Sequence, residues 1–308
     1  MAETEQGNVL RGLSDALAGA VETAGGSVVA IHARRRIPSS GVVWQEGLIV
    51  TASHTLEREE DITVTWPDGT STPASIAGRD AGTDLAVVRP EGGSAVVAQQ
   101  ADADALRVGT LVLALGRPWD AGVTASLGVI SAVGGEWRTW HGGRIDRRVR
   151  LDLAIHDGFS GGPLVGADAR VLGINTSGLG RGAPMTVPAS TVERVATELA
   201  TRGRVRRGDL GLAMQPVILP PGLQERAEAA ETGLLVLHVE PDGPAAAAGA
   251  LIGDVIVAIG GRTVSDLREL AGALAADTIG QSMTVRALRG GEPVSLDVQI
   301  AERPGREV

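Results

Sequence analysis

Short apolar runs bounded by glycine, proline or aspartate fill the first two-thirds of this 308-residue chain. Two of these runs, residues 62–66 and 71–76, are joined by Pro67-Asp68-Gly69, a combination that favours a tight hairpin turn. Apolar residues at helical spacing are scarce in this part of the chain, and 43 residues of the whole are glycine. The pattern predicts many short strands joined by turns, and the length allows two or three compact units.

The segment Gly158-Phe159-Ser160-Gly161-Gly162 places a serine between small residues, just ahead of an apolar run. A nucleophilic serine needs a hydroxyl exposed at a tight turn, with backbone N–H groups beside it to bind an oxyanion. Glycine at 158 permits unusual φ angles and close approach by a substrate. On its own, this motif fits a glycine-rich hairpin loop equally well.

A base and an orienting acid must accompany such a serine. His54 follows one apolar run and Asp84 precedes another, so both are expected at strand ends. The order His, Asp, Ser along the chain is that of chymotrypsin-type enzymes and differs from that of subtilisins and α/β-hydrolases. His156 is the alternative base because it lies near Ser160 in sequence, and Asp80 is the alternative acid.

Four ordered blocks of this chain resemble motifs of the HtrA (Deg) family of serine proteases: residues 40–54, 80–88, 108–118 and 152–164. They contain, in turn, Thr-x-x-His, Thr-Asp-Leu-Ala-Val, Gly-x-Pro and Gly-x-Ser-Gly-Gly-Pro-Leu. Each block alone is weak, but four in family order at compatible spacing are specific. Members of this family have a trypsin-like double barrel followed by PDZ domains. The resemblance therefore implies a mostly β fold, in which a chymotrypsin-like double β-barrel is followed by a small α+β PDZ domain.

The resemblance implies a role for each residue of the site. His54 would be the general base, Asp84 the acid that orients it, and Ser160 the nucleophile. The oxyanion hole would be the segment Gly158, Phe159 and Ser160, through the N–H groups of its first and last residues. The family usually has asparagine where this chain has Phe159, its only phenylalanine. If Phe159 hinders the oxyanion loop, replacing it with asparagine should raise turnover.

The same resemblance places a substrate pocket at His156, Met185, Thr186 and Val187. No aspartate lies at the base of this pocket, which favours a small or aliphatic side chain at the cleaved residue over arginine or lysine. The alternative interpretation is that Met185 and Val187 are ordinary core residues of a strand.

The motifs and the composition divide the chain into five segments: an N-terminal segment (1–26), a protease domain (27–201), a linker rich in arginine and glycine (202–208), a PDZ domain (209–301) and a polar tail (302–308). The protease domain is predicted to end in a helix over residues 190–200, whose apolar residues share one face. The PDZ assignment depends on residues 248–261, which resemble the family block Ala-Gly-x-x-x-Gly-Asp-x-Ile.

PDZ domains add a peptide strand to a sheet edge and hold its terminal carboxylate with backbone N–H groups. By resemblance, two sets of residues would do this here: a carboxylate loop of Leu210, Gly211 and Leu212, and an apolar helix wall of Leu267, Leu270 and Leu274. The family often has an aromatic residue where this chain has Asp209, so we expect weaker carboxylate binding.

The composition excludes several functional classes. The chain has no lysine, which excludes a Walker phosphate loop, Schiff-base chemistry and a Ser–Lys dyad. It has no cysteine, and its five histidines show no metal-ligand spacing, so we expect neither a metal nor a cofactor. A net charge of −9 argues against nucleic acid or an anionic membrane as partner.

The location and the assembly of the protein are less constrained by the sequence. No export signal is visible and no apolar stretch is long enough to span a membrane, so the sequence as given predicts a cytoplasmic location. A periplasmic or extracellular location is the alternative if an export segment is missing. The family forms homotrimers through aromatic N-terminal contacts. The segment before Ser27 contains no aromatic residue, so a homotrimer stays an open expectation.

Together these features predict an ATP-independent serine endopeptidase that cleaves unfolded or misfolded polypeptides through a Ser-His-Asp triad. Its PDZ domain would bind peptide C-termini. The alternative is a latent protease that acts mainly as a chaperone-like or PDZ-mediated binding protein.

Overall fold

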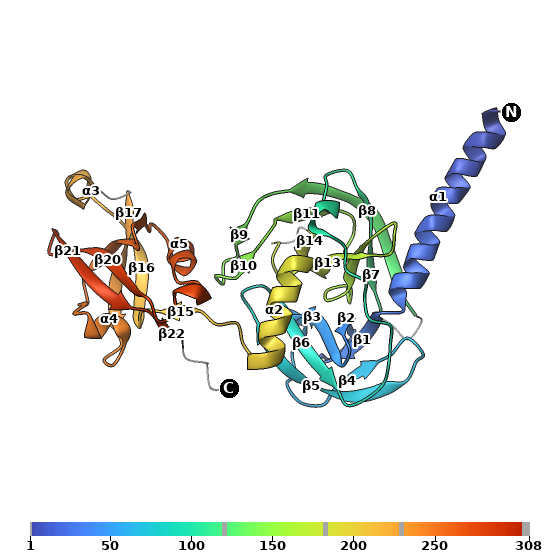
Figure 1. Cartoon of the computed structure of the whole chain (residues 1–308), viewed down its shortest axis with the longest axis horizontal. Helices are drawn as coiled ribbons and strands as arrows, with labels where there is room; N and C mark the ends of the chain where they lie inside the picture. The colour runs from blue at the N-terminus through green and yellow to red at the C-terminus, as the bar shows by residue number, and fades with distance from the viewer. Residues whose placement is uncertain (1, 119–121, 181–183, 228–230, 304–308) are drawn as a thin grey trace. The chain divides into compact units, whose positions relative to one another are not determined.

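The computed structural model describes residues 2–118, 122–180, 184–227 and 231–303. The chain divides into two compact units (Figure 1). Unit 1 consists of residues 1–139 and 143–205, and unit 2 consists of residues 140–142 and 206–308. The main division, between residues 205 and 206, falls inside the predicted linker.

The first barrel of unit 1 is a closed ring of antiparallel strands, drawn from blue to cyan in Figure 1. In spatial order the strands are β1 (Val28–His32), β2 (Ser39–Gln45), β3 (Leu48–Ala52), β6 (Leu85–Pro90), β5 (Ser71–Asp80) and β4 (Ile62–Thr65). The predicted hairpin joins β4 to β5, with Val64 opposite Thr72. Its turn is closed by a hydrogen bond of 2.8 Å from the Trp66 N–H to the Thr70 carbonyl.

The second barrel of unit 1 is also a closed ring of antiparallel strands. In spatial order the strands are β11 (Val149–Asp152), β14 (Met185–Pro188), β13 (Val171–Thr176), β12 (Pro163–Gly166), β7 (Leu111–Gly116) and β8 (Thr124–Val133). Shorter elements of unit 1 are β9 (Trp137–Arg138), which pairs with β10 (Arg144–Ile145), and the 3-10 turns η1 (Ser53–Thr55) and η2 (Ala103–Ala105).

The helix predicted at the end of the protease domain is confirmed as α2 (Ala189–Arg202). It ends at Gly203, whose φ of 74° lies in the left-handed region and whose N–H donates to the Leu199 carbonyl. Val192, Val195 and Leu199 are fully buried in a core shared by residues of both barrels. The apolar face expected from the sequence therefore holds the two barrels together.

Helix α1 (Ala2–Gly25) was not predicted, because charged residues and glycines interrupt this segment. Near its C-terminal end, Ala20 and Ala24 are buried in the shared core. Toward its other end, Val9 and Leu10 are 70% and 69% exposed, and Figure 1 shows the helix extending away from the barrels. The contacts of its last turns thus anchor α1 on unit 1.

Unit 2 is an antiparallel sheet with strands in the order β16 (Leu212–Ile218), β17 (Thr232–Val239), β18 (Val255–Ile259), β20 (Ser282–Arg289) and β21 (Glu292–Gln299). Strand β16 is one edge of this sheet. The remaining elements are β15 (Gly208–Asp209) paired with β22 (Ala301–Glu302), β19 (Arg262–Thr263), α3 (Pro221–Ala227), α4 (Pro244–Ala247), α5 (Leu267–Ala273) and η3 (Ala276–Thr278). The predicted mostly β fold, a double barrel followed by a small α+β domain, is confirmed.

Within the described part of the chain, we find no helix with both the length and the apolar character that crossing a bilayer requires.

Candidate active site

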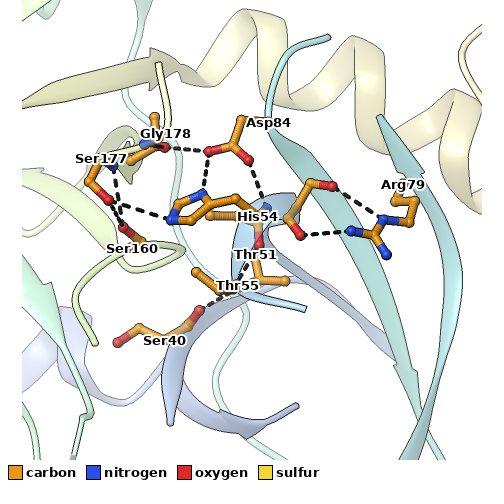
Figure 2. A network of polar contacts seen from close by, with 12 residues as sticks. Ser40, Thr51, His54, Thr55, Arg79, Asp84, Ser160, Ser177 and Gly178 are labelled. Atoms are coloured by element: carbon orange, nitrogen blue, oxygen red, sulfur yellow. Dashed lines mark hydrogen bonds and ion pairs between the residues drawn. The ribbon is translucent and has the colours of Figure 1, made fainter. Parts of the chain in front are cut away.

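The strand pairing of the first barrel brings His54 and Asp84 together. His54 lies in η1, directly after β3, and Asp84 directly precedes β6, which pairs with β3 through Ala52 and Leu85. Figure 2 shows the His54 ring facing the Asp84 carboxylate, with 2.7 Å between Nδ1 and Oδ2. The His54 backbone N–H donates to the other carboxylate oxygen, Oδ1, at 2.8 Å. Two bonds from one residue fix the plane of the carboxylate, and the carboxylate in turn fixes the ring.

Asp84 is held in an uncommon backbone conformation. Its φ of 57° lies in the left-handed region, which costs free energy for a residue other than glycine. The carboxylate is buried and accepts a third hydrogen bond, from the Thr176 hydroxyl at the end of β13. Thr176 Oγ1 itself accepts the Gly178 N–H at 2.9 Å. Residues of both barrels therefore donate hydrogen bonds to the Asp84 carboxylate and hold it in place.

Gly178 approaches this pair so closely that no side chain fits there. A Cβ atom on Gly178 would lie 2.7 Å from Asp84 Oδ2 and 2.9 Å from His54 Nδ1, shorter than real Cβ contacts. The segment after β13 thus packs its backbone directly onto the histidine–aspartate pair.

Ser160 lies in the loop before β12, the loop that the sequence predicts as the nucleophile segment. Gly158 and Gly161 have φ angles of 88° and 89°, the left-handed conformations expected of this motif. The Phe159 N–H donates to the His156 carbonyl at 3.0 Å, and the Gly161 N–H donates to the Asn175 carbonyl at 2.9 Å. The N–H groups of Gly158 and Ser160, by contrast, donate to no acceptor among the described residues. These two groups are the ones predicted to bind an oxyanion.

Ser177 contacts both Ser160 and His54, as the dashed lines in Figure 2 show. Its hydroxyl oxygen is 3.1 Å from Ser160 Oγ and 3.4 Å from His54 Nε2. Its backbone N–H also donates to Ser160 Oγ at 3.3 Å. The described side chains of Ser160 and His54 share no direct hydrogen bond, so Ser177 connects them in this structure.

Phe159 points into the core of the second barrel. Its side chain is 2% exposed and packs in one cluster with residues such as Ala114 and Leu164. A Cβ on Gly116 would lie 2.8 Å from the Phe159 ring, so the ring fills the space beside that strand. His156 is exposed and packs edge-on against this ring, with 5.4 Å between centroids. The ring therefore anchors the nucleophile loop in the core of the barrel.

The residues predicted to line the substrate pocket lie at two places. Met185, Thr186 and Val187 are buried in β14, and Val187 belongs to the shared core. The Thr186 hydroxyl donates to Asn175 Oδ1 at 2.8 Å. His156 lies in the loop before the nucleophile, so the pocket assignment stays a prediction.

Asp80, the alternative acid, caps the turn before Asp84 instead. Its carboxylate accepts hydrogen bonds from the Thr83 N–H at 2.9 Å and from the Thr83 hydroxyl at 2.8 Å. His54 makes its carboxylate contact with Asp84. Among the residues that the structure describes, no cluster of acidic and histidine side chains could hold a metal ion.

The predicted carboxylate loop of unit 2 leads into the edge strand β16. Gly211 has a φ of 70°. The N–H groups of Leu210 and Gly211 have no hydrogen-bond acceptor among the described residues. Helix α5 carries Leu267, which is 47% exposed, and Leu270, which is 5% exposed, while Leu274 is its C-cap. Asp209 has Arg303 3.8 Å away.

Sequence reasoning missed four residues of the site: Ser40, Thr176, Ser177 and Gly178. The last three follow the apolar run of β13 as a polar segment, which is the one signal that marks them in the sequence. Their roles come from contacts across the barrels, and those contacts leave no local pattern.

Two domain families match this chain. The trypsin-like peptidase domain matches residues 39–174, and the PDZ domain matches residues 208–300. A relative named probable periplasmic serine endoprotease DegP-like, from Brucella suis biovar 1 (strain 1330), is 36% identical over 89% of this chain and 54% of its own length. The putative serine protease HhoB of Synechocystis sp. (strain ATCC 27184 / PCC 6803 / Kazusa) is 32% identical over 87% of this chain and 66% of its own length. The chain thus spans between half and two-thirds of the length of these curated relatives.

Solved structures match over almost their full length. The structure described as HtrA-type protease AlgW with decapeptide superposes with a TM-score of 0.73 and 30% identity, covering 94% of this chain and 99% of that one. The serine endoprotease from Yersinia pestis gives a TM-score of 0.71 and 29% identity, covering 92% of this chain and 97% of that one. Both domains match known families, and an HtrA-type protease of 30% identity is covered over 99% of its chain, so this chain belongs to the HtrA family of trypsin-like serine proteases.

Proposed function

We propose that this protein is an ATP-independent serine endopeptidase that cleaves unfolded or misfolded polypeptides. The observation that carries this proposal is the 2.7 Å contact between His54 Nδ1 and Asp84 Oδ2, beside a serine whose loop offers two N–H groups. Relatives of this chain are named serine endoproteases, which supports the same reaction class.

In the proposed mechanism, Ser160 Oγ attacks the carbonyl carbon of the scissile bond. His54 Nε2 takes the hydroxyl proton, and Asp84 keeps the ring in the tautomer whose Nε2 is free to accept it. The carbonyl oxygen becomes an oxyanion, and the N–H groups of Gly158 and Ser160 donate to it. His54 then gives its proton to the leaving amine, which leaves an ester on Ser160. Water hydrolyses this ester by the same steps, again with His54 as base.

Covalent labelling tests this function without knowledge of the natural substrate. A fluorophosphonate should label the wild-type protein at Ser160 and leave Ser160→Ala unlabelled, because the reaction needs the nucleophile, the base and the oxyanion hole together. Casein hydrolysis should disappear in the same variant. His54→Ala should lose nearly as much, since the members of such a triad act as a unit. A wild-type protein that folds but takes no label would contradict the proposal.

A second candidate function is a latent protease that acts mainly in binding, and Ser177 favours it. Ser160 Oγ accepts a hydrogen bond from the Ser177 N–H and shares another with the Ser177 hydroxyl, so within the described part of the chain its partners all belong to Ser177. Such an enzyme would need a rearrangement of this segment before Ser160 could give its proton to His54. Labelling that begins only after an unfolded protein or a peptide is added would favour latency.

Unit 2 is proposed to bind the C-termini of peptides. A peptide strand would pair with the free edge of β16, and its carboxylate would accept the Leu210 and Gly211 N–H groups, which have no acceptor among the described residues. Leu267 and Leu270 would contact the last side chain. One solved HtrA-type structure with a similar fold is described as containing a decapeptide, which is consistent with this role.

Calorimetry on the full chain tests the peptide site. The Ser160→Ala variant prevents cleavage during titration with a peptide that ends in valine, and the amidated form of that peptide is the control. Loss of the terminal charge should weaken binding by roughly 1.5–3 kcal/mol if its hydrogen bonds are charge-assisted. Equal affinity for the two peptides would mean that the carboxylate is not recognised.

The relatives' names favour a periplasmic or extracellular location for this protein over a cytoplasmic one. Fractionation of cells that express the gene from its own start would distinguish these locations. Assembly into a homotrimer stays a prediction, and light scattering on the purified protein would test it.

A further inference from the structure

Ser40 of strand β2 is completely buried against the nucleophile loop. Its hydroxyl donates to the Gly158 carbonyl at 2.7 Å, and its backbone N–H donates to the Ser160 carbonyl at 3.2 Å. A single residue of the first barrel thus binds the loop on both sides of Phe159.

The direction of the Ser40 hydroxyl is set by a second contact. The Arg117 backbone N–H donates to Ser40 Oγ at 2.8 Å, so the oxygen accepts on this side and its proton is directed to Gly158. Arg117 is itself fixed, because its Nε donates to the Val28 carbonyl at 2.8 Å. The Ser40 carbonyl accepts the Thr51 hydroxyl at 2.7 Å, a contact drawn in Figure 2. Every polar atom of Ser40 therefore has a partner that holds it.

The loop packs against Ser40 without free space. A Cβ on Gly161 would lie 2.1 Å from the Ser40 carbonyl oxygen and 2.3 Å from Thr51 Oγ1. The peptide between Gly158 and Phe159 is bound at both ends, because its carbonyl accepts from Ser40 and its N–H donates to the His156 carbonyl. This peptide lies between the two N–H groups assigned to the oxyanion hole. Its orientation limits how each of them can turn.

We infer that Ser40 is a positioning residue for the oxyanion hole: its hydroxyl fixes the peptide between Gly158 and Phe159 and thereby aims the flanking N–H groups. Ser40 is completely buried and shares no hydrogen bond with His54 among the described residues, so we expect it to act through the loop alone. This inference deepens the proposed endopeptidase function and rests on it. Interactions with an oxyanion count in the transition state, so Ser40 should affect turnover far more than substrate binding.

The test compares Ser40→Ala with Ser39→Ala in the full-length protein. Ser39 is the matched control, because it is the neighbouring residue of β2, equally buried, and its hydroxyl contact is a long one of 3.5 Å to the Ile31 carbonyl. The measurements are kcat and KM for a chromogenic peptide with valine at the cleaved residue, and the affinity for a peptide boronic acid. A boronate on Ser160 is tetrahedral and anionic, so it reports on the oxyanion hole directly.

We expect Ser40→Ala to lower kcat about tenfold with KM within about twofold, since a buried carbonyl loses its donor. Boronate affinity should fall by the same factor as kcat/KM, and the pH dependence of the rate should keep its midpoint. Ser39→Ala should stay within about twofold of wild type in all three. Ser40→Cys keeps a side chain of similar size with a weak donor, and a loss of about threefold is expected. It decides the question if Ser40→Ala does not fold.

Wild-type kcat and boronate affinity in Ser40→Ala, or in a folded Ser40→Cys, would overturn the inference while leaving the endopeptidase function intact. An equal loss in Ser39→Ala would also overturn it, because the effect would then follow from strand packing. A folded wild-type protein that reacts with neither fluorophosphonate nor boronate would overturn both proposals.

Discussion

Unit 2 contains two ion pairs of equal length and unequal burial, which allows the effect of burial to be measured. Asp254 accepts from Arg289 Nε and Nη2 at 2.8 Å each and from the Leu251 N–H at 2.9 Å, and its side chain is 2% exposed. Glu292 lies 2.8 Å from Arg226, but its side chain is 73% exposed. The perturbation is Asp254→Asn, and the matched control is Glu292→Gln. Both changes remove one charge and keep the shape of the side chain.

The expected cost follows from the contacts of Asp254. An asparagine keeps one acceptor oxygen and turns an NH₂ group toward a donor, so one partly buried N–H loses its acceptor. Breaking a buried ion pair costs about 3–5 kcal/mol. Arg289 is 37% exposed and water can rehydrate it, so we expect the lower end of this range, about 3 kcal/mol. An exposed pair contributes about 0–1 kcal/mol, which is the expectation for Glu292→Gln.

Hydrogen exchange at neutral pH is the assay, because it reports on unit 2 inside the full chain. The amides of β18, which begins directly after Asp254, and of β20, which ends at Arg289, should show a lower opening free energy in Asp254→Asn than in wild type. A cost below 1 kcal/mol, or an equal cost for Glu292→Gln, would refute the argument from burial.

The difference in stability between wild type and Asp254→Asn should depend on pH with a definite sign. Burial acts to raise the pKa of Asp254, but the hydrogen bonds from Arg289 and Leu251 and the charge of Arg289 outweigh it, so the pKa lies below the ordinary value of 3.8. The unfolded chain therefore binds the proton first as the pH falls. The stabilisation is complete above pH 3.8 and is lost as the pH falls through the lowered pKa of the folded state. Because asparagine does not titrate, the difference in stability between wild type and Asp254→Asn should become smaller as the pH falls below 3.8. A gap that widens there would contradict the assignment.

Four further predictions concern the active site. Gly178→Ala should lower kcat at least tenfold in peptide hydrolysis, because its Cβ would collide with Asp84 and His54 at 2.7 and 2.9 Å; wild-type turnover would contradict this packing. Ser177→Ala should speed fluorophosphonate labelling about fivefold, because it removes the hydrogen bond of about 1 kcal/mol between the Ser177 hydroxyl and Ser160 Oγ. Slower labelling would mean that Ser177 assists the reaction. Peptide hydrolysis should fall as the pH is lowered, because only neutral His54 accepts the serine proton; a rate that does not change with pH would exclude it as base. Phe159→Asn should destabilise unit 1 by roughly 3–5 kcal/mol in urea unfolding and lower turnover, and higher turnover would restore the idea that Phe159 obstructs the loop.

The sequence predicted the parts of this protein that local motifs encode. His54 at the end of β3, Asp84 before β6 and the glycine-rich serine loop are each marked by neighbours in sequence, and the barrel pairings bring the first two together. The orientation of the Phe159 side chain was not predicted, because a single phenylalanine in a loop sequence does not reveal whether its ring faces the core. Ser177 escaped notice because its contacts join segments 17 and 123 residues away. Helix α1 was missed because its glycines and charges hide its spacing, while burial of Ala20 and Ala24 stabilises its end.

The burial of Phe159 couples the shape of the nucleophile loop to the folding of the second barrel. The residue before Ser160 is part of the wall of the second barrel, so a molecule whose barrel loosens also loses the shape of its nucleophile loop. For a protease proposed to degrade unfolded chains, a damaged copy of itself is a potential substrate, and it is also a protease that could cut other molecules. Because Phe159 is anchored in the barrel core, we expect a copy that begins to unfold to lose its nucleophile loop before it can cut other molecules, while intact copies could still digest it.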